Sequence, residues 1–374
     1  MQLTLDSKYV TSSPHIKKRN ISTRAIMLDV IIALVPAFLA AIFFFGHMAL
    51  LNVVYCVVFC VLAEYIYTLV YTKTKPSLKH FKSSSVKDLS CVVTGIVLGL
   101  NLPAVVDVWG VHVISKDVIY FSLDTLLACA AASIFAIVFC KMLFGGLGRN
   151  FANPAMVARV FLLLSFSGGL IMLYSQPLFG MEPAFHLDSG ASWLGLTGDG
   201  VYNANLGNAK SLLNLFIGNT ASSAVGETCK IAIILGYIYL SIRKRIDWRT
   251  PLILMAFVGV FAWLLGFGDS RINYTSVGYV WGYILSQILS GGVMFGAVFM
   301  ATDYVASPNT FWGNVLYLAF IAFFTMLIRI FSAWHEGFSF ALLLGNIITP
   351  LIDRFIYPKP FGYVKKAKVS KVVS

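Results

Sequence analysis

The chain has 374 residues, of which 58% are hydrophobic and only 12% are charged, and its mean hydropathy is +0.81. A soluble domain carries roughly 25% charged residues, so this composition excludes a soluble globular enzyme and a disordered chain. Six cysteines are too few for a secreted disulfide scaffold. Because a membrane helix needs about 20 apolar residues, we expect a polytopic membrane protein.

The formal net charge of +12 does not indicate nucleic-acid binding, because the lysines and arginines lie in clusters between apolar runs. Such clusters orient helices in a bilayer. The first 25 residues are polar and basic, and the apolar run after them is too long for the core of a signal peptide. We therefore expect the first span to remain as an anchor, with lipid and not nucleic acid as the surrounding partner.

Ten apolar runs follow along the chain, and we expect each to cross the bilayer with some tilt. The runs cover residues 26–45, 50–71, 89–106, 118–143, 154–174, 228–242, 251–268, 275–301, 313–332 and 337–356. The sequence therefore predicts an all-α polytopic membrane protein with about ten transmembrane helices.

The placement of basic residues predicts the orientation of these helices. With a cytoplasmic N-terminus, 22 of the 28 lysines and arginines fall in cytoplasmic segments and four fall in outer segments. This asymmetry indicates that both termini are cytoplasmic. We expect a cytoplasmic N-terminal segment (1–25), a first five-helix repeat (26–174), an extracytoplasmic loop (175–227), a second five-helix repeat (228–356) and a basic cytoplasmic tail (357–374).

Glycine, asparagine and proline interrupt the apolar pattern in both halves of the chain. The interruptions lie at residues 101–103, 145–154, 290–292 and 346–350. Broken helices in corresponding positions of two halves indicate inverted repeats with a ligand site at the breaks. A simpler interpretation is that some of these glycines only allow close helix packing, as in the pair Gly95 and Gly99.

The sequence carries no convincing metal or nucleotide motif. The six histidines are scattered over loops and tails, and Cys56 and Cys60 lie one helical turn apart without a second pair to join them. Neither a glycine-rich nucleotide loop nor a nucleophile–base signature is present. We therefore predict no metal site and no catalytic side chain.

The segment Gly226-Glu227-Thr228 directly precedes the apolar part of the sixth run. Its small and acidic residues are typical of a helix start, where they satisfy free N–H groups and favour the positive end of the helix dipole. A helix start is also an anion site. A phosphate near Thr228 would meet free N–H groups and Lys230, and Gly226 would permit its close approach.

Several motifs together resemble the D subunits of Rnf ion-translocating electron-transport complexes, which are homologous to the B subunits of sodium-translocating NADH:quinone oxidoreductases. The similarity extends over essentially the whole chain. It is carried by residues 12–16, 93–95, 102–103, 146–155, 226–228, 299–303 and 346–353.

The resemblance implies two flavins. It implies that Thr228 carries FMN through a phosphoester bond, installed by a flavin transferase that uses FAD, with Gly226, Glu227 and Lys230 beside it. It also implies a non-covalent riboflavin near Asn150 and Asn153, whose amides suit the mixed donor and acceptor edge of an isoalloxazine. The alternative for these two asparagines is that they cap a broken helix.

Ionisable residues inside apolar runs mark ion paths or fixed pairs, because they are costly in lipid. We consider Glu64, Asp303 and Asp353 as candidates for an ion path. Arg159 is expected to pair with a carboxylate or to face a flavin.

The resemblance therefore implies a subunit of a multi-subunit oxidoreductase in the bacterial cytoplasmic (inner) membrane. The subunit would relay electrons through covalent FMN in a complex that couples ferredoxin:NAD electron transfer to Na⁺ or H⁺ translocation. Its partners would be other membrane, flavin and iron–sulfur subunits. The alternative is a secondary transporter or channel without a redox cofactor, since broken-helix repeats also build solute pathways.

Overall fold

The structure is a computed structural model that describes residues 22–73, 85–106, 112–115, 118–166, 209–218, 224–266, 277–332 and 337–356. Every one of the ten apolar runs contains a helix. The first half has α1 (Thr23–Phe45), α2 (His47–Thr72), a 3₁₀ turn η1 (Ser85–Asp88), α4 (Ser90–Asn101), α5 (Leu123–Ile134), a π-helix η2 (Phe135–Met142) and α6 (Pro154–Ser165). The second half has α8 (Ala209–Ile217), a 3₁₀ turn η4 (Val225–Glu227), α9 (Lys230–Ile242), α10 (Arg249–Gly266), α11 (Val277–Leu289), α12 (Val293–Phe299), α13 (Phe311–Phe331) and α14 (Gly337–Phe355).

The number of full-length membrane helices is lower than the predicted ten. Six helices of the described residues are long and apolar enough to cross a membrane, or seven if α11 and α12, which are bent by 48°, form one span. The apolar helices α4, α6 and α9 have only 12, 12 and 13 residues. At about 1.5 Å per residue they cover about 20 Å or less, which is short of the hydrocarbon core of about 30 Å. The fold is that of a multi-pass membrane protein with several half-length helices.

The short helices end where the sequence has its breaks. α4 ends at Asn101, and Leu102 before Pro103 is extended, because the residue before a proline is disfavoured in a helix. α6 begins at Pro154, and the Oδ1 atom of Asn153 accepts a hydrogen bond of 3.1 Å from the amide of Ala155. The predicted breaks at 101–103, 145–154 and 290–292 are therefore confirmed as helix boundaries. The break predicted at 346–350 is wrong, because α14 continues from Gly337 to Phe355 with Pro350 inside it.

The fourth apolar run differs from the prediction at its start. Residues Val118–Ser122 form a strand β2 that pairs antiparallel with β1 (His112–Ser115), and the helix begins only at Leu123. Ser122 ends the strand and caps α5, since its side chain accepts a hydrogen bond from the amide of Thr125. The β-branched and aromatic residues of the run's first part favour a strand as much as a helix, which explains the error.

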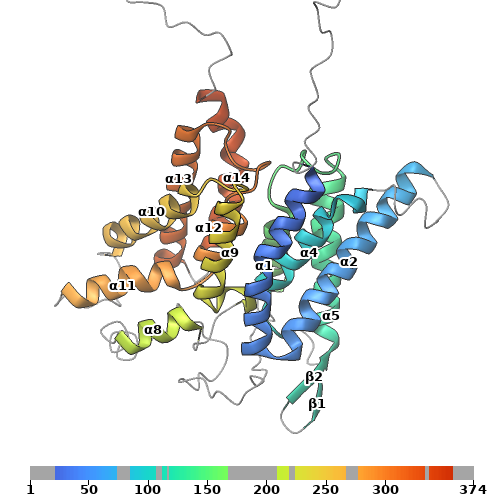
Figure 1. The fold of residues 1–374 in the computed structure, drawn as a ribbon, viewed down its shortest axis with the longest axis horizontal. Helices are drawn as coiled ribbons and strands as arrows, with labels where there is room; N and C mark the ends of the chain where they lie inside the picture. Colours follow the sequence, from blue (N-terminus) through green and yellow to red (C-terminus); the bar gives the residue numbers. More distant parts are fainter. Residues whose placement is uncertain are drawn as a thin grey trace, which may run out of the picture.

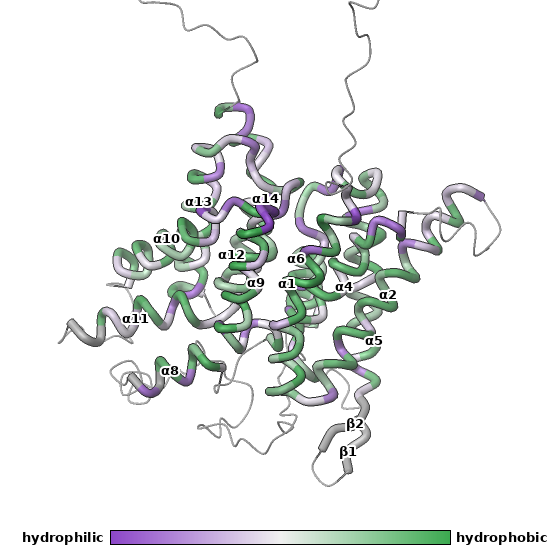
Figure 2. The backbone as a smooth tube through the Cα atoms, in the orientation of Figure 1, coloured by the Kyte–Doolittle hydropathy of each residue, from purple (hydrophilic) through white to green (hydrophobic). Residues whose placement is uncertain are grey.

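The exposed faces of the long helices are apolar. On α2 a stripe with a spacing of four residues is exposed, namely Leu50, Val54, Val58, Leu62, Ile66 and Val70. Figure 2 shows hydrophobic residues along most of the length of α1 and α2. An exposed apolar patch of this length is expected where a helix faces lipid, so the structure supports the membrane assignment.

Two groups of helices meet along a seam between α1 and α9. Figure 1 shows α1, α2, α4 and α5 on one side and α9, α10, α12, α13 and α14 on the other. Gly236 of α9 lies against the backbone carbonyl of Ala33 in α1, without room for a β-carbon. At the end of this seam Asp29 accepts hydrogen bonds from Arg243 (3.1 Å) and Arg245 (2.6 Å). The inverted relationship between the two halves stays a prediction.

Candidate functional site

The turn that carries Thr228 lies against the broken end of α4. The amide of Val225 donates a hydrogen bond of 3.2 Å to the carbonyl of Leu102. A β-carbon at Gly226 would lie 2.6 Å from the Cβ atom of Leu100, so a larger residue at this position would push the two segments apart. Gly226 therefore permits the close approach of the end of α4, whereas the predicted approach of a phosphate at this glycine stays a prediction.

Thr228 itself is buried at the end of the η4 turn. Its side chain is 3% exposed, and its Oγ1 atom donates a hydrogen bond of 2.7 Å to the carbonyl of Val225. Helix α9 begins two residues later at Lys230, with Cys229 as the N-cap residue. The hydroxyl group is thus held at the entry of a half-length helix, and any group attached to it would replace the bond to Val225.

Two charged side chains of the same segment are buried around this turn. The Oε1 atom of Glu227 accepts a hydrogen bond of 3.1 Å from the amide of Ala224, which is the acidic half of a capping box. The ammonium group of Lys230 donates to the backbone carbonyl of Glu227. Both side chains are 2% exposed. The sequence predicted these residues beside Thr228, and the structure shows that both also stabilise the turn.

A third buried charge reaches the junction from α6. Arg159 is 4% exposed, and its Nη1 atom donates a hydrogen bond of 2.9 Å to Oδ1 of Asn101, the last residue of α4. A β-carbon at Gly292 would lie 3.2 Å from Oε2 of Glu227 and 3.5 Å from Nη1 of Arg159. The breaks at Asn101 and Gly292 and the Gly-Glu-Thr turn therefore meet at one junction. The sequence marked each of these features but did not indicate that they are neighbours.

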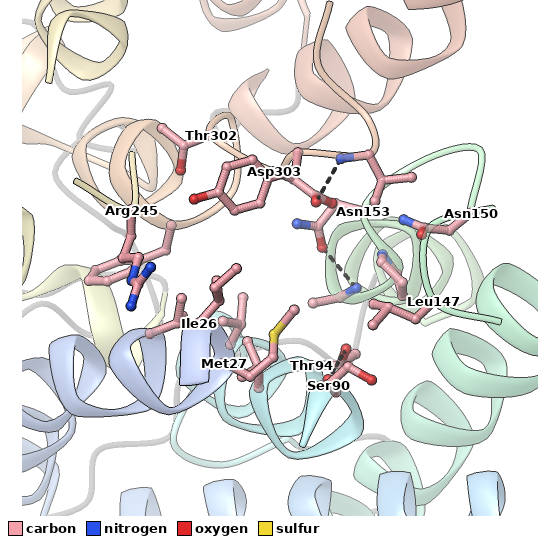
Figure 3. Close-up of a pocket in the computed structure, with 18 of the residues that line it drawn as sticks. Ile26, Met27, Ser90, Thr94, Leu147, Asn150, Asn153, Arg245, Thr302 and Asp303 are labelled. Atoms are coloured by element: carbon pink, nitrogen blue, oxygen red, sulfur yellow. Dashed lines mark hydrogen bonds between the residues drawn. The ribbon is translucent and has the colours of Figure 1, made fainter. Parts of the chain in front are cut away.

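The two asparagines of the predicted riboflavin site line a different space. A cavity of about 150 Å³ lies between the N-terminal end of α6 and the C-terminal ends of α9 and α12, and its wall includes Asn150, Asn153 and Asp303 (Figure 3). The side chain of Asn150 donates to the carbonyl of Ala152 (3.0 Å), while Asn153 caps α6. The capping interpretation is thus confirmed for Asn153.

The cavity is small for a flavin. Ligand pockets usually have about 300–1,000 Å³, and the amides of Asn150 and Asn153 already bond to their own backbone. The cavity in this form therefore does not fit an isoalloxazine, and riboflavin at this place stays a prediction. The cavity borders Leu240, near the C-terminal end of α9, whereas Thr228 precedes the N-terminal end of the same helix. The two predicted flavin positions are therefore at opposite ends of one helix.

The three ion-path candidates have different surroundings. Glu64 is fully buried in an ion pair of 2.5 Å with Lys141, which also donates to the hydroxyl of Ser90 at 2.7 Å. Asp353 is at the exposed end of α14, where it accepts two hydrogen bonds from Asn309. The structure does not bring these two carboxylates together. It supports a fixed pair for Glu64, with Lys141 as a partner that the sequence did not suggest.

Asp303 faces the cavity. Its Oδ1 atom accepts a hydrogen bond of 3.2 Å from the amide of Val305. Burial raises the pKa of the Asp303 carboxyl above its usual value, and the hydrogen bond opposes this shift in part. Lys141 and Ser90 line the same cavity. Asp303 therefore borders the cavity directly, whereas Glu64 is linked to it only through its ion pair with Lys141.

The part of the chain that the structure describes holds no group of three or more histidine, cysteine or acidic side chains that could bind a metal ion. All six cysteines are free thiols. Cys229 is half-buried, and the other five are buried, namely Cys56, Cys60, Cys91, Cys129 and Cys140.

Comparison with known proteins identifies the family. The model of the NQR2, RnfD, RnfE family matches residues 9–121 and 123–362. The chain belongs to this family. It is 36% identical, over 97% of its length and 98% of the relative's, to the D subunit of the Na⁺-translocating ferredoxin:NAD⁺ oxidoreductase complex of Acetobacterium woodii.

Two further relatives are similar over nearly their full lengths. The D subunit of the proton-translocating ferredoxin:NAD⁺ oxidoreductase complex of Clostridium ljungdahlii is 30% identical over 94% of this chain and 96% of its own. The D subunit of the ion-translocating oxidoreductase complex of Actinobacillus succinogenes is 30% identical over 95% of this chain and 98% of its own. The relatives are thus named as subunits of ion-translocating oxidoreductases, and their names include both Na⁺ and H⁺.

Proposed function

We propose that the chain is the D subunit of an ion-translocating oxidoreductase complex that couples ferredoxin:NAD⁺ electron transfer to Na⁺ or H⁺ translocation. The full-length similarity to relatives with this name supports the proposal. We also propose a place in the cytoplasmic (inner) membrane with both termini in the cytoplasm, an orientation that the distribution of lysines and arginines supports. The other membrane, flavin and iron–sulfur subunits of the complex would be its partners.

We further propose that the subunit relays electrons through FMN bonded to Thr228. The observation that carries this proposal is the buried hydroxyl group at the entry of α9, with the buried ammonium group of Lys230 bonded to the same turn. Cations near a helix start suit a phosphate. A flavin transferase would catalyse the attachment. Thr228 Oγ1 would form a phosphoester bond with the FMN part of FAD, the pyrophosphate bond of FAD would break, and AMP and the hydroxyl proton would be released.

The attached flavin would supply reversible redox chemistry, and the protein would fix its position and electrostatic surroundings. Lys230 and the N–H groups at the start of α9 would hold the phosphate. Gly226 would keep the turn close to α4, and Glu227 would maintain the turn's shape through its bond to Ala224. A tether of this kind keeps an electron carrier from diffusing away.

The experiment is in-gel flavin fluorescence of the full chain made with its flavin transferase, together with the mass of the peptide around residue 228. The wild type is expected to fluoresce on a denaturing gel and Thr228→Val to be dark. Thr325→Val is the matched control, because Thr325 is also buried and donates at 2.7 Å to a backbone carbonyl. It should fluoresce like the wild type.

Two results would contradict the proposal. Fluorescence that survives in Thr228→Val would place the attachment at another residue. A wild-type chain without flavin mass, although the transferase is active on another substrate, would instead favour a membrane transporter without a redox cofactor.

A further inference from the structure

Three charged side chains are enclosed at the junction beside Thr228. Arg159, Glu227 and Lys230 are each at least nine-tenths buried. Charges at membrane depth are costly and are retained at functional positions. These three carry one more positive charge than negative, and the phosphodiester of an attached FMN would bring the total to zero. Removal of Arg159 would therefore leave a net negative charge, which acts strongly in the low dielectric of the interior.

Arg159 differs from the other two because it comes from a distant part of the chain. Glu227 and Lys230 flank Thr228 in sequence and make local bonds in the turn. Arg159 belongs to α6, bonds to Asn101 at the broken end of α4, and borders Gly292 at the break between α11 and α12 together with Glu227. A helix cap or a local turn does not require a guanidinium at this place.

We propose that Arg159 is a positioning residue that tunes the flavin on Thr228, by holding the Gly-Glu-Thr turn against the two helix breaks and by supplying a positive charge that favours the reduced flavin. The inference rests on the proposed attachment at Thr228. Reduction adds electrons to the isoalloxazine ring, so a nearby fixed positive charge stabilises the reduced form and raises the reduction potential.

The test is a spectroelectrochemical titration of the full chain with its attached flavin, with dithionite as the reductant. Arg159→Gln removes the positive charge and keeps N–H donors. In the wild type, Nη1 of Arg159 is 2.9 Å from Oδ1 of Asn101. Asn101→Asp therefore places a carboxylate next to the guanidinium and neutralises its charge. Both variants are expected to lower the potential. We expect at least a tenfold weaker preference for the reduced flavin, which is about 30 mV for a two-electron couple.

Two controls separate charge and position from general damage. Arg159→Lys keeps the positive charge and should restore most of the potential. Arg329→Gln removes another buried arginine, which donates to the carbonyls of Gln287 and Ser290 on the α11 side of the break. The potential of the Arg329→Gln variant should stay close to that of the wild type.

The outcomes are distinct from those of the attachment test. If the wild type carries no flavin, the attachment at Thr228 is wrong. If Arg159→Gln or Asn101→Asp carries flavin with the wild-type potential, the tuning role is wrong. If both variants lose the flavin while Arg159→Lys keeps it at the wild-type potential, Arg159 holds the turn for attachment without tuning the flavin, and the tuning role is overturned.

Discussion

At the scale of single residues, Glu64 and Lys141 form a buried ion pair outside the junction, and this pair contributes to the stability of the fold. Glu64 is fully buried, Lys141 is 3% exposed, and their atoms Oε2 and Nζ are 2.5 Å apart. Removing one partner of such a pair leaves an uncompensated buried charge, which costs about 3–5 kcal/mol. Lys141 lies in the π-helix η2, an element that often occurs at functional sites.

We predict that Lys141→Met destabilises the protein by about 3–5 kcal/mol, because it leaves the Glu64 carboxylate alone in the interior. Thermal unfolding of the detergent-solubilised chain measures the effect. The double variant Glu64→Gln with Lys141→Met should regain most of the loss, since it removes both charges. Equal unfolding temperatures for the wild type and Lys141→Met would show that the pair contributes nothing.

Residue identities could be predicted from the sequence where the signal is local. Gly226, Glu227, Thr228 and Lys230 adjoin one another in the chain, and the structure places them around one turn. Lys141 could not be assigned to Glu64 in this way. The two are 77 positions apart, and only the packing of η2 against α2 brings them together.

At the scale of elements, glycines decide how closely α2 and α4 pack. A β-carbon at Gly95 would lie 2.6 Å from the Cα atom of Val57, and one at Gly99 would lie 2.7 Å from the Cα atom of Val53. Both neighbours are backbone atoms, which cannot rotate away. The interpretation of these two glycines as packing residues is therefore confirmed.

We predict that Gly95→Ala costs about 1–3 kcal/mol, because the added methyl group forces two helix backbones apart. Gly259→Ala in α10 is the matched control. A β-carbon there would lie 3.5 Å from side-chain atoms of Ile284 and Ile288, which is ordinary contact. That variant should be neutral or gain up to about 1 kcal/mol from helix propensity. Thermal unfolding of both variants compares them, and equal losses would refute the packing argument.

The positions of the helices followed from hydrophobic runs, whereas their lengths did not. An apolar run continues through a break, since an extended segment buried in protein also needs apolar side chains. Leu102, Ala104, Val105 and Val106 continue the third run, yet they follow the end of α4 and are buried. Composition therefore could not separate a half-length helix with a buried extension from a complete span.

At the scale of the whole molecule, the half-length helices explain how a polar junction can exist inside an apolar body. α4 ends at Asn101, α9 begins at Lys230, and α12 follows the break at Gly292. Helix ends carry free backbone groups that need polar partners. Asn101 donates to the carbonyl of Val97 near the end of α4, Glu227 accepts from the amide of Ala224, and Arg159 binds the side chain of Asn101. The same breaks that shorten the helices therefore create the place where Thr228 is held.

The orientation of the whole molecule yields the last prediction, which uses two exposed lysines. Lys244 lies in the turn after α9, and Lys210 lies in α8, which belongs to the predicted outer loop. Positive residues favour the cytoplasmic side, so Lys244→Cys should react with a membrane-impermeant maleimide only after the cells are opened. Lys210→Cys should react in intact cells.

Background labelling can be kept low in this experiment. Five of the six native cysteines are buried, and Cys229→Ser removes the remaining half-buried thiol. A permeant maleimide applied to the same cells shows that both introduced cysteines are accessible. If Lys244→Cys were labelled in intact cells and Lys210→Cys were not, the molecule would be inverted, and Thr228, which follows the predicted extracytoplasmic loop, would lie toward the cytoplasm. The seam between α1 and α9 would remain, because it depends on packing and not on orientation.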